Sequence, residues 1–268
     1  MNINKPIGVF DSGLGGLTVL QQLQDKLPHE SFVYIGDTAH VPYGNKSDSA
    51  IMDYSHNLSK FLIEEYAVKM IIVACNTASA ITIPSLKSQI DIPIVDVITP
   101  MQNLLFKLKT LKRIGIIGTN NTIKSKSYDK LLLKINPSIQ IFSQACPLFV
   151  PIIEEGLSNH ELATLASQKY LEIFNINNVE ALILGCTHYP IMKKTIQSVL
   201  SPNIKLFDSA EVLAHYTKQY LCDNNLLTNM ADESQTKLFI TDASEYFNDF
   251  ASKILKNNFK DISTIQIF

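Results

Sequence analysis

Short apolar runs alternate with amphipathic stretches along nearly the whole chain. The runs have the length and the continuous apolar character of strands that are buried in a parallel sheet. They are Ile7–Phe10, Phe32–Gly36, Lys69–Ala74, Ile92–Val95, Arg113–Gly118, Ile139–Phe142, Glu180–Gly185, Ile204–Phe207 and Leu238–Thr241. Helical patterns between them cover Leu17–Lys26, Asp48–Tyr66, Ile123–Lys134 and His160–Phe174. Strands and helices that alternate at this rate predict βαβ units, and therefore an α/β fold with a mainly parallel sheet.

A faint internal repeat divides this pattern into two halves. The segment "IGVFDSG" begins at Ile7 and "IGIIGTN" begins at Ile114. At nearly the same distance from each, an apolar strand ends on a cysteine, Cys75 in "VACNTASA" and Cys186 in "LILGCTHYPI". Open α/β sheets place their chemistry at the carboxyl ends of strands. We therefore expect two similar lobes that face each other about a pseudo-two-fold axis and present the two thiols to a shared cleft.

Two thiols on opposite sides of one carbon suit the inversion of a stereocentre. A thiol with an ordinary pKa of about 8.5 becomes a thiolate more readily beside a helix start or a cation. One thiolate can remove an α-proton while the other thiol delivers a proton to the opposite face. No lysine motif for a pyridoxal cofactor stands out, so we expect no cofactor. Cysteine is also a common buried residue, and Cys146 and Cys222 are interpreted as structural.

Composition restricts the partners. The net charge is −2 and Arg113 is the only arginine, which argues against nucleic acid and an anionic membrane surface. It also means that no arginine cluster can hold an anionic substrate. No apolar run has the length of a membrane span. A polar segment follows Met1 directly and the four cysteines form no CxxC pair, so we expect the reducing cytoplasm, no metal site and a small-molecule substrate.

Three loops that follow predicted strands carry polar groups for a small anion. Asp11 and Ser12 begin "DSGLGGLTV", whose glycines expose backbone N–H groups at a helix start. It is not a dinucleotide fingerprint, because Thr18 replaces the third glycine. Tyr43 and Gly44 lie in "GDTAHVPYG", where they offer a hydroxyl and a bare backbone N–H. The remaining loop, "GTNNTIKS", supplies the hydroxyls of Thr119 and Thr122.

These stretches, with "ACNTAS", "CPLFVPIIEEG" and "GCTHYP", resemble the glutamate racemases of the aspartate/glutamate racemase superfamily, in the same order. The resemblance implies cofactor-independent, two-base interconversion of L- and D-glutamate, which supplies D-glutamate for peptidoglycan. It implies an active site between two lobes, residues 1–97 plus 208–268 and residues 98–207. It leaves the oligomeric state open, with a homodimer as one alternative. The short segment before Ile7 departs from relatives that a peptidoglycan precursor activates, so we do not expect such activation.

The resemblance also assigns roles to residues. Cys75 and Cys186 become the acid/base thiols, with Asp11 assisting the first and His188, together with Glu154, the second. Substrate contacts are expected from Asp11, Ser12, Tyr43, Gly44, Asn76, Thr77, Thr119, Thr122, Thr187 and His188. His40 stands where many relatives carry arginine, and it is not expected to touch the substrate.

Other interpretations of the same residues stay open. Asp11 could simply cap a turn, Glu154 could be a surface carboxylate and His188 a packing residue. An aspartate racemase of the same superfamily would also carry both cysteines, and kinetics with the two amino acids would separate the two. A one-cysteine decarboxylase is disfavoured because thiols follow both strands. A catalytically silent amino-acid-binding relative is the alternative outside enzymes.

Overall fold

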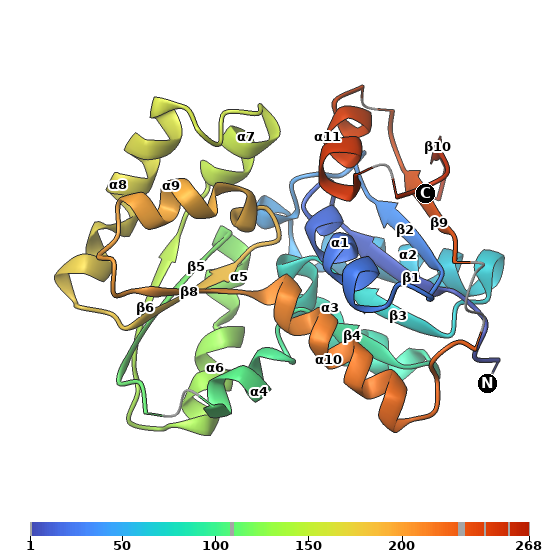
Figure 1. Ribbon diagram of the computed structural model, residues 1–268, viewed down its shortest axis with the longest axis horizontal. Coiled ribbons are helices and arrows are strands. Elements are labelled where there is room, and N and C mark those ends of the chain that lie inside the picture. Colours follow the sequence, from blue (N-terminus) through green and yellow to red (C-terminus); the bar gives the residue numbers. More distant parts are fainter. Residues whose placement is uncertain (1, 108–109, 230–233, 244, 257, 268) are drawn as a thin grey trace.

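The computed structural model describes residues 2–107, 110–229, 234–243, 245–256 and 258–267. It contains two parallel sheets, each in a lobe of its own (Figure 1). The first sheet has the strand order β10-β9-β2-β1-β3-β4. Its strands are β1 (Ile7–Asp11), β2 (Phe32–Gly36), β3 (Met70–Val73), β4 (Ile94–Asp96), β9 (Thr236–Ile240) and β10 (Ile262–Thr264). The second sheet has the order β6-β5-β7-β8, formed by β5 (Arg113–Gly118), β6 (Gln140–Ala145), β7 (Ala181–Gly185) and β8 (Lys205–Asp208).

The internal repeat corresponds to a repeated topology. In both sheets the strand that opens the repeat lies between the next strand and the one that precedes the cysteine, so β2-β1-β3-β4 matches β6-β5-β7-β8. Every described pairing is parallel. Strands β3 and β7 thus hold equivalent places beside β1 and β5. The predicted α/β fold of two similar lobes is confirmed.

Helices cover both faces of each sheet (Figure 1). In the first lobe α1 (Gly16–Lys26), α10 (Ser209–Asp223) and α11 (Glu245–Leu255) cover one face, and α2 (Asp48–Tyr66) and α3 (Asn76–Gln89) the other. Successive side chains of a strand point to opposite faces. Accordingly Ile72 belongs to the core under α1, while Ile71 and Val73 belong to the core under α2. Such burial on both faces explains the continuous apolar runs.

The second lobe follows the same plan. Its helices are α4 (Met101–Lys107), α5 (Asn120–Ser125), α6 (Ser127–Ile135), α7 (Phe149–Glu154), α8 (Glu161–Ile176) and α9 (Lys193–Ser198). Helices α7, α8 and α9 share a core with Leu182 and Leu184 of β7, whereas Ile183 packs on the other side with α6. Two short 3₁₀ turns, η1 (Tyr43–Asn45) and η2 (Tyr189–Met192), lie in the loops after β2 and β7.

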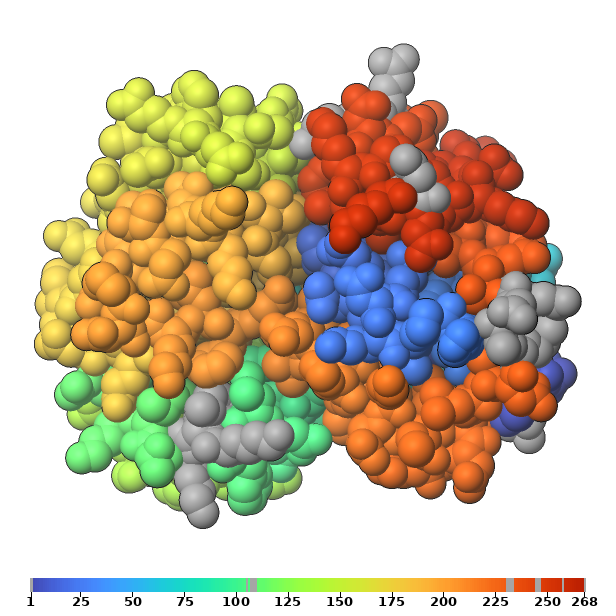
Figure 2. Space-filling view, in the orientation of Figure 1, coloured from blue at the N-terminus to red at the C-terminus, as the bar shows by residue number. Residues whose placement is uncertain are grey.

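The chain passes between the lobes twice, after β4 and again where β8 leads into α10 (Figure 1). The lobes meet along a seam on the face shown in Figure 2. The first passage falls within residues 97–112, of which residues 108–109 lie outside the described ones. The lobe limits at 97/98 and 207/208 stay predictions, with β8 extending to Asp208 in the second sheet.

Two local features differ from the sequence-based prediction. The helix expected over Ile123–Lys134 is two helices, because Lys126 adopts a left-handed φ of 54° between α5 and α6. The short strand β10 was not predicted, since Ser263 and Thr264 interrupt its apolar character. The helix predicted over Asp48–Tyr66 matches α2, whose N-cap Ser47 accepts a hydrogen bond from the Ala50 N–H through its side chain. The described part of the chain contains no helix both long and apolar enough to cross a membrane.

Candidate active site

Cys75 lies between the end of β3 and the first residue of α3. Its Sγ caps this helix by accepting a hydrogen bond from the Ala78 N–H at 3.5 Å, and its thiol donates to Ser12 Oγ at 3.6 Å. The side chain is 5% exposed. Burial raises the pKa of Cys75 to about 12, and the nearby charge of Asp11 adds to this shift. Cys75 is therefore held as a protonated thiol.

Asp11 ends β1, the strand that pairs with β3. Its Oδ2 accepts hydrogen bonds from the backbone N–H groups of Gly13 at 3.1 Å and Gly16 at 2.9 Å. Its Oδ1 is buried and has no hydrogen-bond partner among the described residues. Burial raises the pKa of Asp11, although the charge of His188 and the backbone N–H groups oppose this. Two N–H groups of the turn that was predicted to bind a substrate carboxylate thus donate to Asp11 itself.

Cys186 lies directly after β7 and has a different partner. Its Sγ is 3.7 Å from Nδ1 of His188, whose Nε2 is 3.1 Å from a carboxylate oxygen of Glu154. Burial alone would lower the pKa of His188, but the hydrogen bonds and charges of Cys186 and Glu154 together raise it to about 10. An imidazolium at this position stabilises a thiolate on Cys186.

Both thiols line one small cavity between the lobes. Its volume is about 20 Å³, room for about one water molecule. Ten of the predicted site residues line it: Ser12, Tyr43, Gly44, Cys75, Asn76, Thr77, Thr119, Cys186, Thr187 and His188. It is also lined by Val41, Pro42 and Val150, which the sequence did not single out although they lie within the quoted motifs.

The other three predicted residues do not line the cavity, but each acts on a residue that does. Thr122 Oγ1 is 3.0 Å from Thr119 Oγ1, and Glu154 contacts His188. Asp11 lies close enough to Cys75 to affect the pKa of its thiol. His40 does not line the cavity, and its Nδ1 is 2.9 Å from an Asp37 carboxylate oxygen instead.

Polar contacts cross the seam beside the thiols. Thr77 of the first lobe and Thr119 of the second have their hydroxyl oxygens 2.9 Å apart. The Asn121 amide donates to the backbone carbonyls of Tyr43 at 3.1 Å and Lys46 at 2.8 Å, so α5 holds the η1 turn from the opposite lobe. These bonds keep both lobes against the cavity.

Comparison with known proteins identifies the family of this chain. Residues 17–217 match the family described as Asp/Glu/hydantoin racemase. The chain belongs to that family. This racemase is 38% identical to the glutamate racemase of Geobacter metallireducens over 98% of this chain and 97% of that protein. It is 40% identical to that of Sulfurihydrogenibium over 93% of this chain and 94% of the relative.

Solved structures give the same result. The glutamate racemase of Francisella tularensis in complex with D-glutamate has 38% identity and a TM-score of 0.92, over 99% of the racemase described here and 98% of that chain. The glutamate racemase of Thermus thermophilus in complex with β-chloro-D-alanine has 37% identity and a TM-score of 0.88, over 99% and 98% of the two chains.

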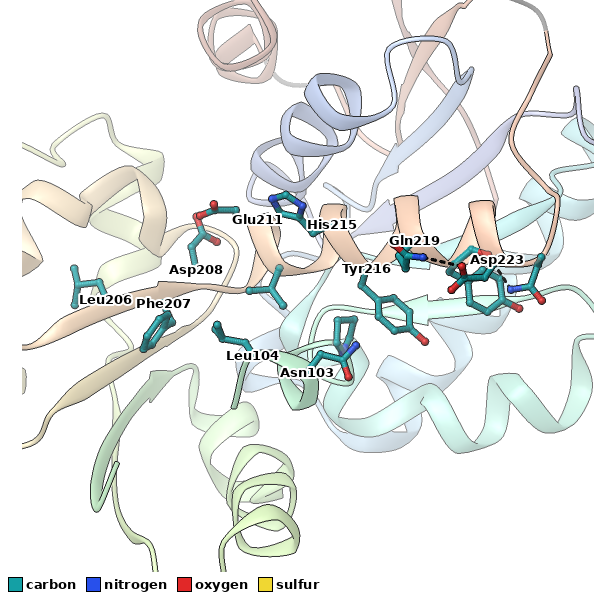
Figure 3. Close-up of a pocket in the computed structure, with 14 residues that line it drawn as sticks. Asn103, Leu104, Leu206, Phe207, Asp208, Glu211, His215, Tyr216, Gln219 and Asp223 are labelled. Atoms are coloured by element: carbon teal, nitrogen blue, oxygen red, sulfur yellow. Dashed lines mark hydrogen bonds between the residues drawn. The ribbon is translucent and has the colours of Figure 1, made fainter. Parts of the chain in front are cut away.

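A much larger groove lies elsewhere in this racemase. It has a volume of about 610 Å³ and runs along α10 between α4 and β8 (Figure 3). Asp208 and Glu211 stand near one end, and Tyr216 and Asp223 further along the helix. None of the predicted site residues lines it. Among the described residues, no group of three or more His, Cys, Asp or Glu side chains is arranged to hold a metal ion.

Proposed function

We propose that this racemase interconverts L- and D-glutamate by proton transfer between two thiols, without a cofactor. One observation carries the proposal: Cys75 and Cys186, from equivalent strands of the two lobes, line the same cavity. Relatives similar over nearly the whole chain are glutamate racemases, which supports glutamate as the substrate.

The proposed step removes the proton from one face of the α-carbon and adds a proton to the opposite face. A thiolate takes the α-proton, so the C–H bond breaks, an S–H bond forms and the electron pair stays on carbon. The opposite thiol then gives its proton to the other face and becomes a thiolate. The product is the mirror image, and the protein is left with its single shared proton on the other sulfur, ready for the reverse reaction.

The two sides of the cavity differ in their resting protonation. The raised pKa of His188 favours an imidazolium beside Cys186, which supports a thiolate there. The raised pKa of Cys75 keeps its proton in place. We therefore assign Cys186 as the resting base and Cys75 as the resting acid. Asp11 is the group proposed to assist Cys75, and Glu154 orients His188.

The substrate carboxylates are proposed to bind hydroxyl, amide and backbone donors. Arg113 cannot serve, because it stands at the amino end of β5 and its Nε donates to the Asn178 carbonyl at 2.9 Å. The cavity offers Ser12, Thr77, Thr119 and Thr187 instead, as well as the Asn76 amide. Fixed donors in a dry site also stabilise the charge that develops on the α-carboxylate as the proton leaves.

The volume of the cavity implies that the lobes part during turnover. Room for about one water is far too little for an amino acid. Admission of glutamate therefore requires the contacts across the seam, such as Thr77–Thr119, to open and re-form around the substrate. Closure would exclude water from the carbanion.

The decisive experiment incubates L-glutamate with purified, cofactor-free protein in heavy water. We expect deuterium at the α-carbon together with appearance of D-glutamate, and no gain on addition of pyridoxal phosphate. A parallel incubation with L-aspartate tests the aspartate racemase alternative. Absence of both exchange and inversion with glutamate would favour a silent amino-acid-binding protein.

Wider roles follow from the same proposal. D-Glutamate made in the cytoplasm would supply peptidoglycan synthesis, and depletion of the protein in its host should be rescued by external D-glutamate.

A homodimer is proposed as the assembly. Sedimentation analysis would contradict it by finding only the mass of one chain at assay concentrations.

A further inference from the structure

The Asn76 amide is fixed by a residue of the opposite lobe. Asn76 is the first residue of α3 and is 2% exposed. Its Oδ1 accepts a hydrogen bond of 2.6 Å from the hydroxyl of Tyr128, the second residue of α6. Its Nδ2 is buried and has no hydrogen-bond partner among the described residues. Burial of a donor without a hydrogen-bond partner costs free energy, so we expect a ligand in the cavity to accept a hydrogen bond from Nδ2.

The direction of the Tyr128 hydrogen bond follows from the neutral state of its phenol. Burial and the charge of Asp96 raise the pKa of Tyr128 well above the ordinary value for tyrosine, although Ser209, the buried first residue of α10, acts to lower it. The phenol therefore keeps its proton. Because an amide oxygen can only accept, Tyr128 uses that proton to donate to Asn76 Oδ1.

The position of Tyr128 is itself closely defined. The side chain is 1% exposed, and a Cβ added to Gly185 would lie 3.1 Å from its ring. Gly185 ends β7 immediately before Cys186, so the ring rests on the strand that carries one thiol. The neighbouring Ser127 donates to the Ala80 carbonyl of α3 at 3.3 Å. The start of α6 is thus docked on α3, across the seam.

We propose that Tyr128 is a positioning residue: it donates to Asn76 Oδ1 and thereby turns the Nδ2 donor of the amide toward a substrate carboxylate. An amide that is free to rotate would present its oxygen to the carboxylate about as readily as its nitrogen, and that contact is repulsive. Because Tyr128 and Asn76 belong to different lobes, the amide is oriented only when the lobes are together. The inference rests on the proposed function, since it takes a carboxylate of glutamate as the partner of Nδ2.

The test is Tyr128→Phe, which retains the ring against Gly185 and removes only the hydroxyl. We expect KM for both enantiomers to rise roughly tenfold, the effect of about one hydrogen bond, with kcat much less affected because a carboxylate contact is made in the ground state and the transition state alike. A melting-temperature measurement establishes that the variant is folded in the assay. Tyr170→Phe is the matched control, because it removes a hydroxyl from a second-lobe tyrosine that does not line the cavity.

A double-mutant cycle separates positioning from a general structural effect. In an Asn76→Ala background, Tyr128→Phe should change KM less than twofold, since the amide on which it acts is gone. An unchanged KM in Tyr128→Phe overturns the inference, as does a full tenfold effect that persists in the Asn76→Ala background. A wild-type protein that fails to racemise glutamate would instead refute the proposed function.

Discussion

His188 Nδ1 lies 3.7 Å from Sγ of Cys186, so one of the two thiols is paired with an imidazole. The other thiol, Cys75, donates instead to the hydroxyl of Ser12 at 3.6 Å. The lobes share one topology, yet their thiols have partners of different basicity. In the proposed mechanism the shared proton therefore rests on Cys75, and this asymmetry underlies the prediction for the pH profile.

Serine at either thiol position should abolish racemisation. A serine hydroxyl is somewhat smaller than a thiol and does not ionise near neutral pH, so neither Cys75→Ser nor Cys186→Ser retains both proton carriers. We expect each variant to lose roughly 10³-fold or more in kcat/KM, by the same factor for L- and D-glutamate because the enantiomers have equal free energies in water. Circular dichroism at a fixed wavelength follows both directions. Cys222→Ser, at an exposed free cysteine, is the control; full activity in either thiol variant would refute the two-thiol assignment.

The pH profile should fall on the alkaline side near pH 10. His188 has a raised pKa of about 10, so its imidazolium persists below that pH and is lost as the pH rises through it. The Cys75 thiol, with a pKa of about 12, is still protonated there. Loss of the imidazolium removes the positive charge that stabilises a thiolate on Cys186. Measurement of kcat/KM from pH 6 to 11 should show the decline, and His188→Gln should be much slower and lack that limb. An unshifted limb in His188→Gln would assign it to another group.

Gly15→Ala should disable the Cys186 side although Gly15 itself has no functional side chain. A Cβ at Gly15 would overlap both His188 Nδ1 and Thr187 Oγ1, so these side chains must move. A misplacement of about 1 Å in a catalytic group can cost about 10²-fold, and we expect a loss of that size in kcat/KM. Gly13→Ala is the matched control, since its Cβ meets only Val41, at 3.3 Å. Similar activities in the two variants would show that this contact does not position His188.

The fold was predictable because strands buried on both faces leave a continuous apolar signature. The prediction for Phe32–Gly36 matches β2 residue for residue, and that for Arg113–Gly118 matches β5. Where burial is partial the signature weakens, and β10 (Ile262–Thr264), with two exposed residues among its three, gave none. The break at Lys126 was missed because a left-handed lysine has no sequence signal comparable to that of glycine.

The site was predictable only in part. Motifs and the repeat identified the thiols and most residues that line the cavity, since both cysteines follow equivalent strands. The resemblance also assigned His188 to Cys186, and His188 Nδ1 lies 3.7 Å from that thiol. The motifs could not give the contact between Tyr128 and Asn76, because hydrogen bonds between lobes link residues far apart in sequence. The turn at Asp11 was expected to offer N–H groups to substrate, and two of them bind Asp11 instead.

Lys69 should be important for stability, not for catalysis. Its Nζ is buried, 2.6 Å from a carboxylate oxygen of Glu30, and donates to the Ile3 carbonyl at 2.6 Å and the Leu226 carbonyl at 2.8 Å. Lys69→Met leaves the Glu30 charge buried without its partner, so the free energy of unfolding should fall by about 3–5 kcal/mol. Urea denaturation measures the loss, and kcat/KM of the remaining folded protein should be unchanged. Lys60→Met, at an exposed lysine, should alter stability by about 0.5 kcal/mol or less. Removal of both charges in Lys69→Met/Glu30→Leu should recover part of the loss. Equal stability of Lys69→Met and Lys60→Met would contradict the prediction.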